Sequence, residues 1–139
     1  MEVNYIFLQH IFYTLNTNLN LQHFVTSVLN YLDIDDLHRM ILDELVVEFG
    51  LDDLSEAELD YFNRAWHRLT PWPDTVGGLN RLKSQFVIAT LSNGNVSLLT
   101  IMAMHTGLPW DAVFSAELAQ HYKPDPVSYT HLRAHETPE

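Results

Sequence analysis

The sequence predicts an α/β fold with a parallel sheet, and three observations support that prediction. Residues 86–91 form a short apolar run rich in β-branched side chains and bounded by polar residues, which is typical of a strand buried on both faces of a parallel sheet. Residues 112–115 are expected to form a second strand. A helical pattern at residues 96–105 lies between them, so the order strand, helix, strand indicates a βαβ unit.

Composition limits the classes of partner. The chain has 139 residues, a formal net charge of −11 and a pI near 4.9, which argues against a nucleic-acid or anionic-membrane partner. It contains no cysteine, so disulfides and thiolate chemistry are excluded, and we expect a cytoplasmic protein. Residues 3–15 are too short to span a membrane and are interrupted by Gln9 and His10, so we expect no membrane segment.

The first 32 residues differ in composition from the remainder. They contain no Lys or Arg and several Asn, and their apolar spacing predicts two amphipathic helices. Two interpretations of residues 1–32 stay open: a native extension, or sequence foreign to the rest of the chain.

Residues 33–73 are expected to be helical. Leu37, Ile41 and Leu45 fall on one helical face, and Gly50 is placed to end that helix in a left-handed conformation. Ser55 and Glu58 have the spacing of a capping box, which predicts a second helix that must stop before the prolines near residue 71. Residues 33–60 are strongly acidic, with Arg39 their only Lys or Arg, and we interpret this run of charge as a solvated helix face.

Residues 74–126 contain the predicted sheet. We expect Asp74 to cap a helix over residues 75–83, and Gly107 to end the helix between the two strands. After the second strand, the sequence Tyr-Lys-Pro-Asp-Pro predicts a rigid turn that fixes the position of Lys123.

Polar side chains follow the first strand directly. Ligands of open α/β sheets bind outside the carboxyl ends of the strands, so Ser92, Asn93 and Asn95 are candidate binding residues. Lys123 follows the second strand and is expected at the same edge. A hydroxyl, an amide and a cation together suit an anionic group held beside a nucleophilic carboxylate. The alternatives are an ordinary turn for Ser92-Asn93 and a surface lysine for Lys123.

These two segments resemble known motifs. Residues 91–95, Leu-Ser-Asn-Gly-Asn, and residues 121–126, His-Tyr-Lys-Pro-Asp-Pro, are similar to the second and third motifs of the haloacid dehalogenase superfamily. Residues 107–111 and 114–118 are similar to its type II 2-haloacid dehalogenases in particular. The resemblance runs from about residue 36 to residue 126. It implies a Rossmann-like core, present here only in part, with residues 33–73 as an N-terminal helical cap and residues 74–126 as the partial core.

The resemblance also implies a reaction. In that family an aspartate attacks the halogen-bearing carbon of a short 2-haloalkanoic acid, and water then hydrolyses the aspartyl ester to give a 2-hydroxy acid. It implies that Ser92 and Asn93 bind and orient the substrate carboxylate and the nucleophile, and that Lys123 pairs with the nucleophile. Lys123 and Ser92 are therefore the expected catalytic residues. The resemblance implies neither a metal nor another cofactor. A magnesium-dependent phosphatase of the same superfamily and a non-catalytic interaction module are the alternatives.

The chain departs from the family pattern at its beginning. No stretch of residues 1–36 matches the family's first motif, which carries the nucleophilic Asp, and we therefore expect this chain alone to be an inactive fragment. Loss of neighbouring core strands would expose a sheet edge, which predicts aggregation or a homodimer.

The end of the chain has a different interpretation. Residues 127–137 resemble, codon for codon, the translation of a transposase sequencing adaptor, so we interpret residues 127–139 as an adaptor-derived tail. Tyr129 lies six residues after Lys123, where the family has an active-site Tyr. It is therefore a candidate site residue, although the adaptor alone would supply it.

Overall fold

The computed structural model describes residues 31–130, and the predicted helices of the first 32 residues lie almost entirely outside this range. The chain divides into two compact units, Met1–Asn63 and Arg64–Glu139. Each unit is described by itself below.

The first unit contains the helix α3, Ile34–Phe49. Asp33 precedes it and its carboxylate accepts a hydrogen bond from the Asp36 N–H at 2.9 Å, which satisfies one of the free donors of the first turn. Gly50 follows the helix at φ 61°, the left-handed conformation expected from the sequence. The buried face of α3 consists of Ile34, Leu37, His38, Ile41, Leu42 and Leu45.

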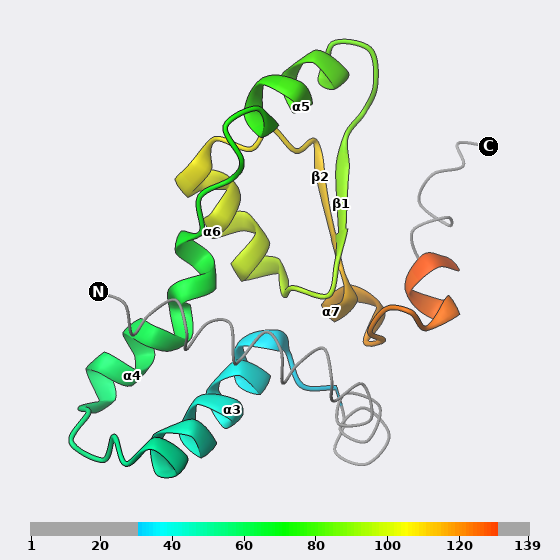
Figure 1. Cartoon of the computed structure of the whole chain (residues 1–139). Coiled ribbons are helices and arrows are strands. Elements are labelled where there is room, and N and C mark those ends of the chain that lie inside the picture. Colours follow the sequence, from blue (N-terminus) through cyan, green and yellow to red (C-terminus); the bar gives the residue numbers. More distant parts are fainter. Residues whose placement is uncertain (1–30, 131–139) are drawn as a thin grey trace. The chain divides into compact units, whose positions relative to one another are not determined.

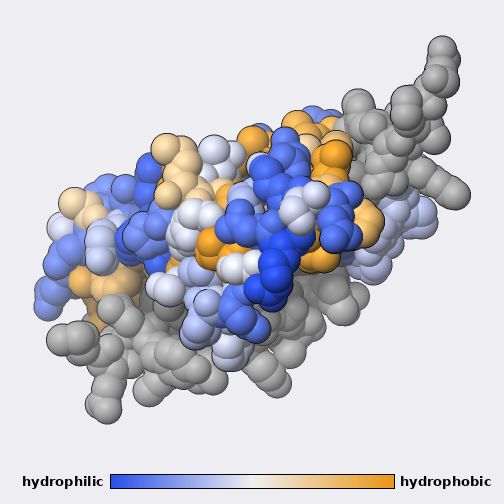
Figure 2. Space-filling model, turned by 90° about the horizontal axis from the view of Figure 1, so that it is seen from above, coloured by the Kyte–Doolittle hydropathy of each residue, from blue (hydrophilic) through white to orange (hydrophobic). Residues whose placement is uncertain are grey.

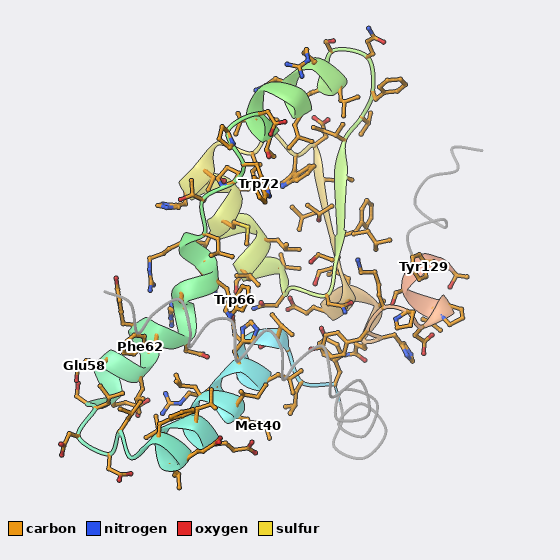
Figure 3. The ribbon with its side chains drawn as sticks, in the orientation of Figure 1. Met40, Glu58, Phe62, Trp66, Trp72 and Tyr129 are labelled. Atoms are coloured by element: carbon orange, nitrogen blue, oxygen red, sulfur yellow. The ribbon has the colours of Figure 1, made fainter. Side chains whose placement is uncertain are left out.

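The helix α4, Glu56–Asn63, begins with the predicted capping box. The Ser55 N–H donates to the Glu58 carboxylate at 2.9 Å, and the Glu58 N–H donates to the Ser55 hydroxyl oxygen at 3.4 Å. The Ser55 hydroxyl also donates to the Glu58 carboxylate at 2.6 Å. This bond, followed by the one from the Ser55 N–H, holds the pKa of Glu58 below its ordinary value. Glu58 is labelled at the start of α4 in Figure 3.

One arginine joins α3 to α4, which lie side by side (Figure 1). The Arg39 guanidinium donates to both Glu56 carboxylate oxygens, at 2.5 and 2.8 Å, and to Asp43 at 2.8 Å. Its hydrogen bonds lower the pKa of Glu56. The Asn63 amide also donates to the Asp35 carbonyl at 3.1 Å, so side chains of both helices fix the hairpin.

The second unit begins with a 3₁₀ helix, η1, Arg64–Arg68, followed by α5, Thr75–Lys83. The predicted capping of α5 by the Asp74 side chain is wrong. Asp74 has helical backbone angles, φ −93° and ψ −10°, and its side chain makes no capping hydrogen bond. Asp74 does occupy the N-cap position, and its carbonyl accepts from the Gly78 N–H at 2.8 Å, so the side-chain bond is the part of the predicted cap that does not form.

The sheet and its crossover helix confirm the α/β prediction. β1, Ala89–Ser92, and β2, Ala112–Ser115, pair in parallel with Ala89 opposite Ala112 and Ser92 opposite Ser115. The helix α6, Val96–Thr106, connects them and packs against β2 and η1 (Figure 1). Gly107 ends α6 at φ 72°, as expected. A short helix, α7, Ala116–Ala119, follows β2.

The first strand begins later than residues 86–91 predicted. The N–H of Phe86 donates to the Leu82 carbonyl at 2.9 Å, so the last turn of α5 continues to that residue. The Phe86 and Val87 side chains are 62% and 84% exposed, which contradicts burial on both faces. The face displayed in Figure 2 has hydrophobic residues among hydrophilic ones. Pairing with the second strand begins at Ile88, which is buried.

An ion pair closes the amino-terminal end of the two strands. The Asp111 carboxylate accepts from the Ile88 N–H at 3.0 Å and lies 2.6 Å from the Lys83 amine. The backbone bond from Ile88, followed by the bond from Lys83, lowers the pKa of Asp111. The amine also donates to the Pro109 carbonyl at 2.8 Å. One lysine therefore ties the end of α5 to the segment that enters β2.

Candidate functional site

The turn after β1 brings the first candidate residues to the carboxyl end of the strand. The Ser92 hydroxyl oxygen accepts the Gly94 N–H at 3.1 Å, which closes a tight side-chain turn. Gly94 is buried, and a Cβ at this position would lie 3.0 Å from a methyl group of Leu98. The backbone therefore approaches α6 closely here, and a glycine allows that approach.

Asn93 binds the backbone of Lys123, a residue 30 positions further along the chain. The Lys123 N–H donates to Asn93 Oδ1 at 2.8 Å, and Asn93 Nδ2 donates to the Lys123 carbonyl at 3.4 Å. Both ends of one carboxamide thus hold one residue of the predicted rigid turn, in which the Lys123–Pro124 peptide bond is cis. The structure brings together the two segments that the sequence singled out.

The Lys123 amine reaches the first strand. Lys123 Nζ donates to the Leu91 carbonyl at 2.7 Å, next to Ser92. The Ile88 carbonyl accepts from Asp111 and so faces β2. Because successive carbonyls of a strand alternate in direction, the Leu91 carbonyl faces the opposite edge of β1. The ammonium group therefore lies at the carboxyl end of the strand, on the edge away from β2.

A second turn, after β2, makes hydrogen bonds to the first. Its role was not predicted from the sequence. The buried Ser115 hydroxyl donates to the Gly94 carbonyl at 2.6 Å and accepts the Glu117 N–H at 3.1 Å. The Glu117 carboxylate accepts the Val96 N–H at 2.6 Å, at the start of α6. Serine followed two residues later by glutamate is a helix N-terminal pattern, which was the available signal for the local bond. Nothing in the sequence indicated the contacts with Gly94 and Val96.

Two further candidates have different surroundings. Asn95 is buried, and its amide donates to the Ser97 hydroxyl at 2.9 Å, so its side chain contributes to the start of α6. Tyr129 lies on the short helical segment at residues 126–130 and is 47% exposed (Figure 3). The Lys123 contacts described above involve Leu91 and Asn93, and neither Asn95 nor Tyr129 takes part in them.

The groups at the end of β1 are suited to bind an anion. The Ser92 hydroxyl and the Asn93 carboxamide lie next to each other in the sequence. The Lys123 ammonium group binds the carbonyl of the preceding residue, Leu91. These three groups are neutral or positively charged, which favours a carboxylate or another anion. Among residues 31–130 no cluster of three metal-binding side chains occurs, and no helix there is long and apolar enough to cross a membrane.

The chain is similar in sequence and in structure to 2-haloacid dehalogenases. No family model matches the chain. The chain is 37% identical over 105 residues to (S)-2-haloacid dehalogenase 1 of a Pseudomonas species, strain CBS-3. Its structure resembles a crystal structure of an L-2-haloacid dehalogenase with a TM-score of 0.74 and 47% identity. The chain belongs to the haloacid dehalogenase superfamily.

A third relative has a structure with a covalently bound compound. It is the L-2-haloacid dehalogenase of Xanthobacter autotrophicus with chloropropionic acid covalently bound, with a TM-score of 0.64, 30% identity and coverage of 78% of this chain and 44% of that one. The alignments with the Pseudomonas enzyme and with the 47% identical structure cover 71% and 78% of this chain. They cover 44% and 48% of those two relatives, so the chain spans about half of their length.

Proposed function

We propose that the protein of which this chain forms a part is a hydrolase of carbon–halide bonds that converts short 2-haloalkanoic acids to 2-hydroxy acids. Three relatives named 2-haloacid dehalogenases support this proposal, and one of them is described with chloropropionic acid covalently bound. The supporting observation in this chain is the position of the Lys123 amine, 2.7 Å from the Leu91 carbonyl on the outer edge of β1.

That position suits a partner carboxylate. A strand added in parallel to the outer edge of β1 would end beside Lys123, so an aspartate at its end would meet the ammonium group. The cation would keep that aspartate ionised and aligned for attack on the halogen-bearing carbon. The Ser92 hydroxyl and the Asn93 amide would hold the substrate carboxylate beside it, and Asn95 would support the turn from the start of α6. We propose that residues 33–73 act as the cap and residues 74–126 as part of the core, with residues 127–139 outside both.

Turnover is the first test. No stretch of residues 1–36 resembles the nucleophile motif, and we expect the chain to release no halide from 2-chloropropionate, because loss of a nucleophile removes most of the catalysis. Halide release measured by ion chromatography above that of the Ser92→Ala variant would contradict this expectation.

Binding tests the site directly in the chain as it exists. Titration with 2-chloropropionate, followed by amide NMR, should shift the signals of Ser92, Asn93 and Lys123. Lys123→Met should weaken binding about tenfold, because it removes a charged hydrogen-bond donor. The matched control is Arg81→Met, which removes an exposed cation of α5 and should leave binding unchanged. Equal effects of the two variants would overturn the assignment of Lys123.

The remaining features of the proposal have their own tests. The outer edge of β1 has no paired strand among residues 31–130, which supports a homodimer or aggregation, and a monodisperse monomer by light scattering would argue against it. A cytoplasmic protein agrees with the absence of cysteine. The phosphatase alternative requires magnesium-dependent hydrolysis of a phosphate ester by a full-length relative, and failure of that assay would remove it.

A further inference from the structure

The turn after β1 contains a dipeptide with its own chemistry. The sequence has nine asparagines, and Asn93 is the only one followed by glycine. Glycine lacks a Cβ, so its backbone nitrogen can approach the side chain of a preceding asparagine with little steric hindrance. Asparagine is also among the thermally labile residues of proteins. This dipeptide is therefore the most reactive asparagine in the chain once its conformation is free.

We propose that Asn93-Gly94 is a deamidation site that the folded turn keeps unreactive through the Ser92 hydroxyl and the Lys123 backbone. In the reaction, the Gly94 nitrogen attacks Cγ of Asn93 and loses its proton. The new N–Cγ bond forms as the Cγ–Nδ2 bond breaks, and ammonia leaves with that proton. Water then opens the five-membered succinimide to give aspartate or isoaspartate at position 93.

The first restraint acts on the electrophile. The attack requires the Asn93 side chain to turn its carboxamide carbon toward the next backbone nitrogen. Oδ1 accepts the Lys123 N–H at 2.8 Å, and Nδ2 donates to the Lys123 carbonyl at 3.4 Å. Both polar atoms of the carboxamide are therefore held by one residue, and the rotation must break both bonds.

The second restraint acts on the nucleophile. The Gly94 N–H donates to the Ser92 hydroxyl oxygen at 3.1 Å, and the Gly94 carbonyl accepts from the buried Ser115 hydroxyl at 2.6 Å. The peptide groups on both sides of the glycine are thus fixed. The next segment is fixed too, because the Val96 N–H donates to the Glu117 carboxylate. A free glycine in this turn would rotate, whereas this one is bound at both polar atoms.

The modification would alter the turn in two ways. A carboxylate at position 93 cannot donate to the Lys123 carbonyl, so one of the two bonds between the segments is lost. Isoaspartate also adds a methylene to the main chain, which moves Gly94 relative to Ser115 on β2 and Val96 relative to Glu117 on α7. Unfolding of this turn would therefore be followed by a covalent change that opposes its recovery.

The test compares the folded chain with the same chain unfolded in urea, both incubated in mildly alkaline buffer. Trypsin releases the peptide 84–133, because the Lys123–Pro124 bond resists cleavage, and mass spectrometry with fragment sequencing locates the modification. We expect deamidation at position 93 in the unfolded chain, and at least tenfold slower reaction in the folded chain, since two or more hydrogen bonds of about a factor of five each must open. Equal rates would overturn the proposal, as would faster reaction at another asparagine in the unfolded chain.

Variants separate the restraint from general instability. Ser92→Ala should accelerate the reaction of the folded chain about fivefold, the factor of one typical hydrogen bond. Ser92→Thr keeps the hydroxyl acceptor and should restore protection. The matched control is Ser84→Ala, which removes an exposed hydroxyl bonded to the Arg81 carbonyl and should leave the rate unchanged. Circular dichroism confirms that each variant is folded. An unchanged rate in folded Ser92→Ala would assign no protection to Ser92 and would overturn its part of the proposal.

Discussion

The two turns at the carboxyl ends of β1 and β2 use the same local device for different purposes. Ser92 and Ser115 are paired in the sheet register, and each accepts the N–H of the residue two positions ahead. Ser92 is only partly buried and lies beside Lys123. Ser115 is 4% exposed, and its hydroxyl donates a hydrogen bond to the Gly94 carbonyl. The turn after β1 therefore contains the candidate site residues, and the turn after β2 holds that turn in position.

The largest effect should come from breaking the supporting turn. Ser115→Ala removes two hydrogen bonds and leaves buried partners unsatisfied, so we expect a loss of about 2–3 kcal/mol in the free energy of unfolding. Ser92→Ala removes one bond at a partly exposed position, and we expect about 1 kcal/mol. Urea denaturation followed by circular dichroism measures both. The assignment of roles fails if Ser92→Ala is the more destabilising of the two.

The Glu117 carboxylate links the turn after β2 to the start of α6. Its bond to the Val96 N–H stabilises the start of α6, so Glu117→Ala should lower the free energy of unfolding by about 1 kcal/mol. Glu117→Gln keeps an acceptor oxygen and should recover about half of that loss. The control is Glu48→Ala on the exposed part of α3, which we expect to be nearly neutral. Identical losses for Ala and Gln would show that the acceptor is not what matters.

The smallest effect concerns the opposite end of the same two strands. The pKa of Asp111 is lowered in the folded chain by the Ile88 N–H and then by Lys83. A carboxylate with a depressed folded pKa contributes stability above its unfolded pKa and loses it as pH falls through the folded value. Thermal unfolding between about pH 5 and pH 3 should therefore show a decline that Asp111→Asn reduces. An Asp111→Asn variant with an unchanged pH profile would exclude this contribution.

Much of the fold could be predicted because its signals are local. Gly50 and Gly107 end α3 and α6 in the left-handed conformation, and the Ser55–Glu58 capping box forms with the expected partners. The start of β1 could not be predicted, because backbone bonds that continue α5 as far as Phe86 compete with an apolar, strand-like sequence. The local sequence pattern favours a strand from Phe86, whereas in the structure Phe86 continues the last turn of α5.

Some residues of the candidate site could be predicted from the sequence and others could not. The segments with Ser92-Asn93 and Lys123 were identified from their residue types, and the structure brings them into contact. The roles of Ser115 and Glu117 were missed, because their bonds to Gly94 and Val96 cross 21 positions of sequence. Sequence patterns report neighbours along the chain, whereas this support depends on neighbours across the sheet.

Arg39 leaves the helical hairpin with an unusual dependence on ionic strength. Residues 33–60 contain eleven carboxylates and this one basic residue, which binds both Asp43 and Glu56. Dissolved salt screens the bonds that this cation makes, but it also screens repulsion among all the acids around it. Pairs of like charges outnumber pairs of opposite charges in this hairpin, so screening by counter-ions weakens repulsion more than attraction. We therefore expect added salt to stabilise α3 and α4.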